Sequence, residues 1–389
     1  IGVVVSAILF GFMICTTVIT GENRTAVNNF FGTGDFVTFE PKDAPEQDTE
    51  YFKSKYKSVA ELIEAGKTAA QNIEAEGAVL LKNENNALPL DVGAGEKRIS
   101  LFGISSVDPA YGGRGSAQTG SPLPPVTPKE GFEHAGFEVN PKLYDFYASS
   151  GNTYKRVGRG TQAKINDAPW SDVAAAVSAD DIAAYGDAAI MILTRVGGEG
   201  SDMAMTGTDG EDGNYLKLSE REKSVLTGMA QLKKQGKIKK IVVLLNVSNQ
   251  LESKFLYDAE YAVDAALLIG CAGISGFNAV GDIVAGKVNP SGRLSDTFWF
   301  EHKYNPATYN FGAFTYTNAA EMGLPTTKLG TLDGKYSSYV VYAEGIYVGY
   351  RYAETRYYDV VTKRPNTGSF DYSKIISHPF GYGESYTSF

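Results

Sequence analysis

The sequence predicts an α/β fold in which helices flank a mostly parallel sheet, an α/β sandwich, followed by a β-rich, loop-rich C-terminal extension. Two observations favour it. The continuous apolar runs AAIMILTRV, KIVVLLNV and AALLIGCA have the length and composition of strands that are buried on both faces. Amphipathic helical patterns alternate with these runs, as crossover helices between parallel strands require. After about residue 298, aromatic residues, glycines and short alternations replace this pattern.

Composition places the chain among ordinary globular proteins. It has 389 residues, of which 43% are hydrophobic and 21% charged, so it is long enough for one large or two medium domains. The net charge is −9 and there is no basic cluster, so no nucleic-acid partner is expected. The two cysteines are not expected to pair, and the three histidines are scattered. No metal site and no cofactor are therefore expected.

The chain opens with an apolar run, IGVVVSAILFGFMICTTVIT, that carries no charge. A helix of this length matches the thickness of a bilayer. We expect residues 1–21 to be a transmembrane anchor or, alternatively, a signal segment; a buried core element is a third reading. Residues 22–56 include the acidic stretch EPKDAPEQDTE and are expected to be a solvated linker. The protein is accordingly expected to be anchored to the cell membrane with an extracellular domain, or secreted.

The sandwich core is expected over residues 57–300. It begins with a helix that Ser58 caps, with Glu61 at capping-box spacing, and that runs into the strand AVLLKN. The strand RISLFG follows, and then the long polar loop ISSVDPAYGGRGSAQTG. A helix over PKEGFEHAG, a strand FEVN and a helix over PKLYDFYASS lead to the buried strand AAIMILTRV.

The second half of the core repeats this alternation. A helix over residues 219–236 is expected to start at the capping box of Ser219 and Glu222 and to stop at Gly236. The strands KIVVLLNV and AALLIGCA follow, and then a helix over SGFNAVGDIVAG. Residues 301–389 form the extension, where EGIYVGYRYAETRYYD is expected to consist of strands and extended arms packed on the core.

Ligands of open parallel sheets bind beyond the carboxyl ends of the strands. Two loops are expected there: ISSVDPAYGGRGSAQTG, and GGEGSDM after AAIMILTRV. The first loop lacks G-x-G-x-x-G and G-K-[ST], which argues against a nucleotide site and leaves a structural turn or the polar rim of a sugar site. The residues for such a rim are Tyr111, Arg114 and Ser116. In the second loop, Glu199 is either a solvated carboxylate or an acid held out for catalysis, with Asp202 as a neighbour.

Five segments resemble, in order, the α/β sandwich domain of family-3 glycoside hydrolases of the β-glucosidase type. They are AAQNIEAEGAVLLKNENNALPL, RISLFGISSVDPAYGGRGS, IGCAGISGFNAVGDIVAGKVNPSGRLSDTF, EGIYVGYRYAETRYYD and FGYGESYTSF. The similarity covers about residues 60 to 389. It implies a retaining, exo-acting β-glycosidase, and most simply a β-glucosidase that removes terminal β-D-glucosyl residues.

The resemblance also implies a role for Glu199. Many members of the family carry their general acid/base in an S-G-E-G-x-D stretch, which GGEGSD matches with Gly198 in place of the serine. The family's nucleophile is an aspartate on a (β/α)8 barrel, and no barrel fits in this chain. A hydrophobic segment followed first by the sandwich resembles members with reversed domain order, in which a fibronectin-like domain and the barrel come later. This chain alone is therefore expected to be inactive.

The expected partners are an oligosaccharide or an aryl or alkyl β-glycoside, and the missing barrel and fibronectin-like domain; a homodimer is left open. β-Xylosidase or another β-glycosidase activity of the family remains an alternative. A non-catalytic carbohydrate-binding module that kept the fold and lost the chemistry is a second alternative, and a nucleotide-binding α/β protein is a third.

Overall fold

The computed structural model describes residues 2–22, 54–113, 123–149, 153–158, 162–197, 203–310, 314–326, 331–332, 334–365 and 370–385. The chain divides into two compact units, Ile1–Lys57 and Ser58–Phe389. The first unit contains the helix α1 (Gly2–Glu22), and every described strand lies in the second. The five predicted site residues therefore all belong to the second unit.

The apolar N-terminal run forms α1, but the predicted membrane anchor is wrong. Among the described residues, no helix is both long enough and apolar enough to cross a bilayer. The hydroxyls of Thr16 and Thr17 donate to the carbonyls of Phe12 and Met13 at 2.9 and 2.8 Å, and α1 ends at the charged Glu22. The alternative, a signal segment of a secreted protein, stays a prediction.

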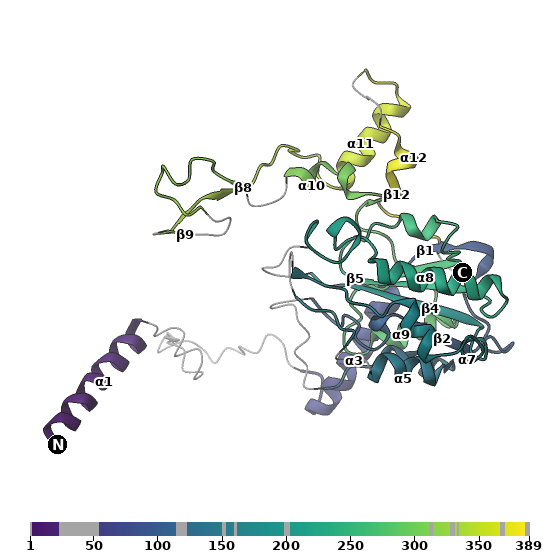
Figure 1. Ribbon diagram of the computed structural model, residues 1–389, viewed down its shortest axis with the longest axis horizontal. Helices are drawn as coiled ribbons and strands as arrows, with labels where there is room; N and C mark the ends of the chain where they lie inside the picture. The colour runs from purple at the N-terminus through teal and green to yellow at the C-terminus, as the bar shows by residue number, and fades with distance from the viewer. Residues whose placement is uncertain are drawn as a thin grey trace, which may run out of the picture. The chain divides into compact units, whose positions relative to one another are not determined.

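Six described strands form the sheet at the centre of the second unit (Figure 1). The strand order is β1-β6-β5-β4-β2-β3; β1 runs antiparallel to β6, and the other neighbours are parallel. The predicted α/β class with a mostly parallel sheet is confirmed. The strands are β1 (Val79–Asn83), β2 (Arg98–Phe102), β3 (Glu138–Val139), β4 (Ala188–Arg195), β5 (Ile241–Val247) and β6 (Ala265–Leu268).

Helices cover both faces of this sheet, because both faces of its strands are apolar. Along β4, Met191 and Leu193 join one buried cluster, whereas Ile190 and Ile192 join the other. The first cluster includes side chains from α5 (Pro141–Ser149), α6 (Trp170–Ala176), α7 (Ala179–Ala183) and α8 (Glu220–Lys234). The second includes side chains from α4 (Pro128–Ala135) and α9 (Gly276–Val284), and α3 (Val59–Gly77) packs on α9.

The predicted helix ends are confirmed where a cap determines them. The Ser58 hydroxyl accepts the Glu61 N–H at 3.2 Å at the start of α3. Ser219 and Glu222 form a full capping box at the start of α8, in which each side chain accepts the other residue's backbone N–H. Gly236, just beyond α8, has a φ of +73°, a conformation that glycine adopts without steric cost.

The C-terminal extension contains short paired strands and helices. β7 (Phe298–Trp299) pairs with β12 (Ile376–His378), β8 (Phe314–Thr315) with β11 (Ser338–Tyr339), and β9 (Thr331–Leu332) with β10 (Lys335–Tyr336). The helices are α10 (Pro306–Asn310), α11 (Tyr350–Val361) and α12 (Tyr372–Ile375).

One segment of this extension differs from its prediction. Residues 344–359 were expected as strands and arms, but from Tyr350 onward they form the helix α11. The reason lies in packing. Tyr352 stacks on Trp299, Ala353 is fully buried, and Arg356 pairs with Asp359 one turn further along, so that helical spacing satisfies these contacts. The spacing of the tyrosines is compatible with a strand and with a helix face, and only the packing partner distinguishes the two.

A buried ion pair closes the end of β4. The Arg195 guanidinium, which is fully buried, donates to Glu222 Oε1 and Oε2 at 2.9 and 2.8 Å. Its remaining N–H groups donate to the carbonyls of Thr194, Tyr215 and Lys217, so all five donors are used. Burial disfavours the charged guanidinium, but the Glu222 carboxylate outweighs this and raises the pKa of Arg195 above its ordinary value. The pair therefore joins the end of β4, the start of α8 and the loop between them.

We expect Arg195→Met to lower the free energy of unfolding by about 3–5 kcal/mol, because it leaves the Glu222 carboxylate buried without its cation. Urea denaturation of the whole chain measures this change. The matched control is Lys142→Met, which breaks the exposed pair between Lys142 and Asp181 (2.6 Å) and should change stability by less than about 1 kcal/mol. Equal effects of the two substitutions would contradict the role assigned to Arg195.

A buried acid that forms no ion pair with any described residue lies between α3 and α9. Glu74 is 8% exposed, and its Oε1 has no hydrogen-bond partner among the described residues. A Cβ on Gly276, at the start of α9, would lie 3.1 Å from the Glu74 Cβ and Cγ, so the glycine makes room for this side chain. Burial raises the pKa of Glu74 from 4.5 to about 8. Glu74 is therefore held in its neutral form at the helix interface.

The stability that neutral Glu74 contributes is fully present below pH 4.5 and is lost as the pH rises to about 8. Glu74→Gln keeps a neutral side chain at every pH. Relative to the parent chain, the variant should gain more than about 1 kcal/mol in free energy of unfolding between about pH 5 and about pH 9. Denaturation at the two pH values measures the difference, and a difference that does not change with pH would rule out a buried neutral acid.

Candidate functional site

The carboxyl ends of the parallel strands carry a small cavity, here called the edge pocket. Its volume is about 200 Å³. It is lined by the segment that follows β2, by the residue that follows β4, and by one arginine from the 153–158 segment. The lining residues are Pro109, Ala110, Tyr111, Gly112, Gly113, Arg156 and Val196. The edge pocket thus lies where ligands of open α/β sheets bind.

One predicted site residue, Tyr111, lines the edge pocket. Arg114, Ser116, Glu199 and Asp202 lie outside the described residues. The first predicted loop nevertheless lines this cavity, since Tyr111 to Gly113 directly precede Arg114, and Val196, the last residue before the second predicted loop, lines it as well. The structure therefore brings the origins of the two loops together at one place.

Tyr111 is held in the pocket wall by packing. Its ring meets Phe277 of α9 edge-on, with ring centroids 5.9 Å apart and planes at 85°, and its carbonyl accepts the Gly273 N–H at 2.9 Å. Burial, with smaller contributions from Tyr144, Glu130 and Asp108, raises the pKa of Tyr111 above its ordinary value. The phenol stays protonated at neutral pH, so it can donate a hydrogen bond to a hydroxylated ligand.

Asn246, in the buried strand β5, fixes the floor of the edge pocket. Its Oδ1 accepts the Ala110 N–H at 2.6 Å and the Thr194 hydroxyl at 2.8 Å. Its Nδ2 donates to the carbonyls of Ala110 and Gly270 at 3.0 and 2.6 Å. One fully buried amide therefore joins β4 and the segments that follow β2 and β6. The signal for this residue in the sequence is a lone amide inside the apolar run KIVVLLNV, because a buried amide needs hydrogen-bond partners.

Arg156 is a second residue that the sequence did not single out. Its side chain is 10% exposed, and Nη2 donates to the Asp108 carbonyl and lies 3.3 Å from Asp108 Oδ2. Nε and Nη1 are buried without a hydrogen-bond partner among the described residues. Unpaired buried donors cost free energy. The edge pocket therefore holds a guanidinium whose donors are only partly used, beside the segments that lead to Arg114 and Glu199.

Asp167 carries a buried carboxyl group near the carboxyl ends of the strands, but its environment differs from that of a catalytic acid. Burial, and then the Glu222 charge, raise the pKa of Asp167 to about 7. Such a shift is common at active sites. However, Asp167 is 1% exposed, and its Oδ1 accepts the N–H groups of Ile104 and Ala168 at 2.9 and 2.7 Å. Asp167 therefore holds the turn after β2 and is closed to a substrate.

Gly197 shows why a glycine follows the end of β4. A Cβ at this position would lie 3.0 Å from Sδ and 3.1 Å from Cγ of Met203, the first described residue after the Glu199 segment. A side chain at position 197 would therefore require the Met203 side chain to move. The first glycine of the predicted catalytic stretch thus lies close against Met203 in the described structure.

Comparison with known proteins identifies the family. Residues 78–350 match the Glycosyl hydrolase family 3 C-terminal domain. The chain is 30% identical to the Beta-glucosidase A of Butyrivibrio fibrisolvens over 81% of its length and 29% identical to a Beta-glucosidase of Ruminococcus albus over 82%. It covers 34% and 28% of these two relatives, so it spans about a third of their length.

Comparison with a solved structure supports this family assignment. The chain superimposes on beta-glucosidase 3B from Thermotoga neapolitana, solved in complex with glucose, with a TM-score of 0.60 and 28% identity, over 84% of this chain and 39% of that one. The fold of the second unit is thus similar to part of that beta-glucosidase. The chain therefore belongs to glycosyl hydrolase family 3, and it contains the α/β sandwich that forms the C-terminal domain of that family.

Proposed function

We propose that this chain is the sandwich-domain part of a retaining, exo-acting β-glycosidase, a β-glucosidase that hydrolyses terminal non-reducing β-D-glucosyl residues, and that Glu199 is its general acid/base. The observation that carries the proposal is the position of GGEGSD in a family-3 chain. The stretch follows β4 directly, and Val196, just before it, lines the edge pocket with Tyr111. The β-glucosidases among its relatives support the choice of sugar.

The chemistry needs two carboxyl groups about 5–5.5 Å apart, one as the proton donor to the leaving oxygen and one as the nucleophile. In the proposal, Glu199 supplies the first. The second comes from the (β/α)8 barrel of the same enzyme, outside this chain. Glu199 must hold its proton near neutral pH, which burial by bound sugar and the nearby nucleophile would promote.

The edge pocket would contact the leaving group. Tyr111 offers a protonated phenol, and Arg156 offers a guanidinium with unused donors, which suit hydroxyl groups of a second sugar. We assign Arg114 and Ser116 to the same rim, and Asp202 to the neighbourhood of Glu199, because they belong to the two segments that follow Gly113 and Val196, which line this pocket.

Exposed apolar side chains of the extension support the proposed partner domains. Tyr342 is 86% exposed, Ile346 70% and Tyr336 64%. Large apolar side chains that are exposed at neighbouring positions of the sequence suit a protein–protein contact. We propose that residues 336–348 pack on the barrel or the fibronectin-like domain of the complete enzyme. Self-association of the chain stays a prediction.

The purified 389-residue chain should release no detectable nitrophenol from 4-nitrophenyl β-glucoside, because one carboxyl group cannot carry out both steps of a retaining mechanism. Absorbance of the released nitrophenolate measures this, and the Butyrivibrio relative assayed in parallel is the positive control. Sustained turnover by the chain would mean that it carries its own nucleophile, contrary to the proposal.

The role of Glu199 is tested in a protein that joins this chain to a family-3 barrel. Glu199→Ala should lower kcat on a poorly activated glucoside by about 10²- to 10⁴-fold, and azide should restore part of the rate on an activated aryl glucoside. Glu220→Ala, a change at the exposed first residue of α8, is the matched control and should leave kcat unchanged.

Unchanged kcat in Glu199→Ala would remove Glu199 from the mechanism. If the parent fusion folds, binds cello-oligosaccharides and hydrolyses none of them, the chain is better described as a carbohydrate-binding module. The same fusion tested on 4-nitrophenyl β-xyloside separates the β-xylosidase alternative from the proposed β-glucosidase.

A further inference from the structure

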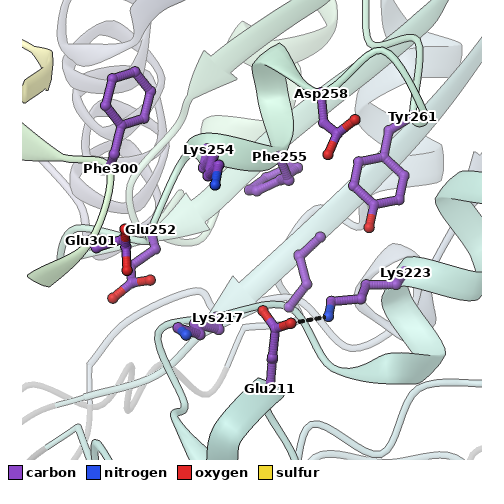
Figure 2. Close-up of a pocket in the computed structure, with 11 residues that line it drawn as sticks. Glu211, Lys217, Lys223, Glu252, Lys254, Phe255, Asp258, Tyr261, Phe300 and Glu301 are labelled. Atoms are coloured by element: carbon purple, nitrogen blue, oxygen red, sulfur yellow. Dashed lines mark ion pairs between the residues drawn. The ribbon is translucent and has the colours of Figure 1, made fainter. Parts of the chain in front are cut away.

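A second cavity lies between the loop that precedes α8 and the segment that follows β5 (Figure 2). Its volume is about 270 Å³. The side chains that surround it come from four parts of the chain and include three lysines, four carboxylates and three aromatic rings. None of its lining residues lines the edge pocket. It is therefore a separate feature of the sandwich.

The polar walls of the second cavity are held in place before any ligand binds. Lys217 and Lys223 form ion pairs with Asp212 and Glu211, each at 2.7 Å. Glu252 is 8% exposed, and its Oε1 accepts a backbone N–H from the segment after β7 at 3.0 Å. The Lys217 carbonyl also accepts an N–H of the buried Arg195 guanidinium, which fixes the loop. Side chains that are already ordered lose little entropy on binding.

Several groups around the cavity keep unused hydrogen-bonding capacity. The Lys254 ammonium and the Tyr261 hydroxyl have no ion pair or hydrogen bond with any described residue, and neither does Glu252 Oε2. These groups offer donors and an acceptor around one space (Figure 2). A ligand that both donates and accepts hydrogen bonds would satisfy them together.

The charges of the lining exclude some ligand classes. Because lysines and carboxylates alternate around the cavity, it presents neither the cationic surface that binds phosphate nor the acidic one that binds metal ions. Within the described part of the chain, no group of three or more His, Cys, Asp or Glu side chains could hold a metal ion. The rings of Phe255, Tyr261 and Phe300 add apolar faces. Mixed polar groups with aromatic faces match a small, neutral, polyhydroxylated ligand.

We propose that the second cavity binds one neutral hexose unit, separately from the edge pocket. The choice of a saccharide over other polyhydroxylated molecules rests on the proposed function. The cavity and the arrangement of its polar groups do not depend on that function. Its volume of about 270 Å³ is just below the usual range for ligand sites, which fits one sugar ring and not an oligosaccharide. Lys254 and Tyr261 donate to sugar hydroxyls, and Glu252 Oε2 accepts from one.

The test is saturation-transfer NMR with glucose on the whole chain and on two variants. Lys254→Met and Tyr261→Phe each remove one donor at a position where folding does not depend on it, and each should weaken glucose binding at least about fivefold. Lys142→Met, at an exposed lysine of α5, is the matched control and should bind as the parent does. Circular dichroism confirms the fold of each variant.

Tyr111→Phe locates the binding site, because it changes only the edge pocket. Loss of glucose binding in Tyr111→Phe with full binding in Lys254→Met and Tyr261→Phe would overturn the proposal, and so would the absence of saturable binding to the parent chain. Weaker binding in both cavity variants with unchanged binding in Tyr111→Phe supports it, and an equal loss in all three variants would contradict a site separate from the edge pocket. The binding experiment measures no hydrolysis, so its outcome is independent of the Glu199 experiment. If Glu199→Ala leaves kcat unchanged but glucose binding still depends on Lys254, the proposed function is wrong and the glucose site in the second cavity stands.

Discussion

The end of β4 depends on one buried ion pair, Arg195 with Glu222. The strand is apolar up to Thr194 and Arg195, and a guanidinium there is tolerable only because all five of its donors are used. Glu222 is at the same time the third residue of α8 and the partner of Ser219 in its capping box. The end of a central strand and the start of the helix behind it are thus fixed by one carboxylate.

Two functional features follow from this position. On one side the chain continues from Arg195 through Val196 and Gly197 into the stretch that contains Glu199, so the buried pair fixes the point from which the proposed acid departs. On the other side the guanidinium holds the carbonyl of Lys217, a residue that lines the second cavity. Asn246 performs a similar task one strand away, where its amide joins the edge of the sheet beneath the edge pocket.

Much of the fold was predictable because its determinants are local. Buried parallel strands are continuous apolar runs, and Ser58 and Ser219 mark helix starts by hydrogen bonds to residues three positions away. The helix α11 was not predictable, because its contact with Trp299 spans about fifty residues of sequence. The absence of charges in the N-terminal run did not suffice to predict a membrane-spanning helix. The described site was predictable only in part: Tyr111 lies in a recognisable loop, whereas Arg156 becomes relevant only once the chain folds it beside that loop.

Hydrogen exchange of the backbone amides in Arg195→Met tests most directly whether the buried pair holds the strand end and the loop as one unit. Amides of residues 193–197 and 215–217 should exchange at least about tenfold faster relative to those of β1 than they do in the parent chain, because both segments lose their contact with the Arg195 guanidinium. A uniform acceleration across the sheet, or no change at these two segments, would contradict the account.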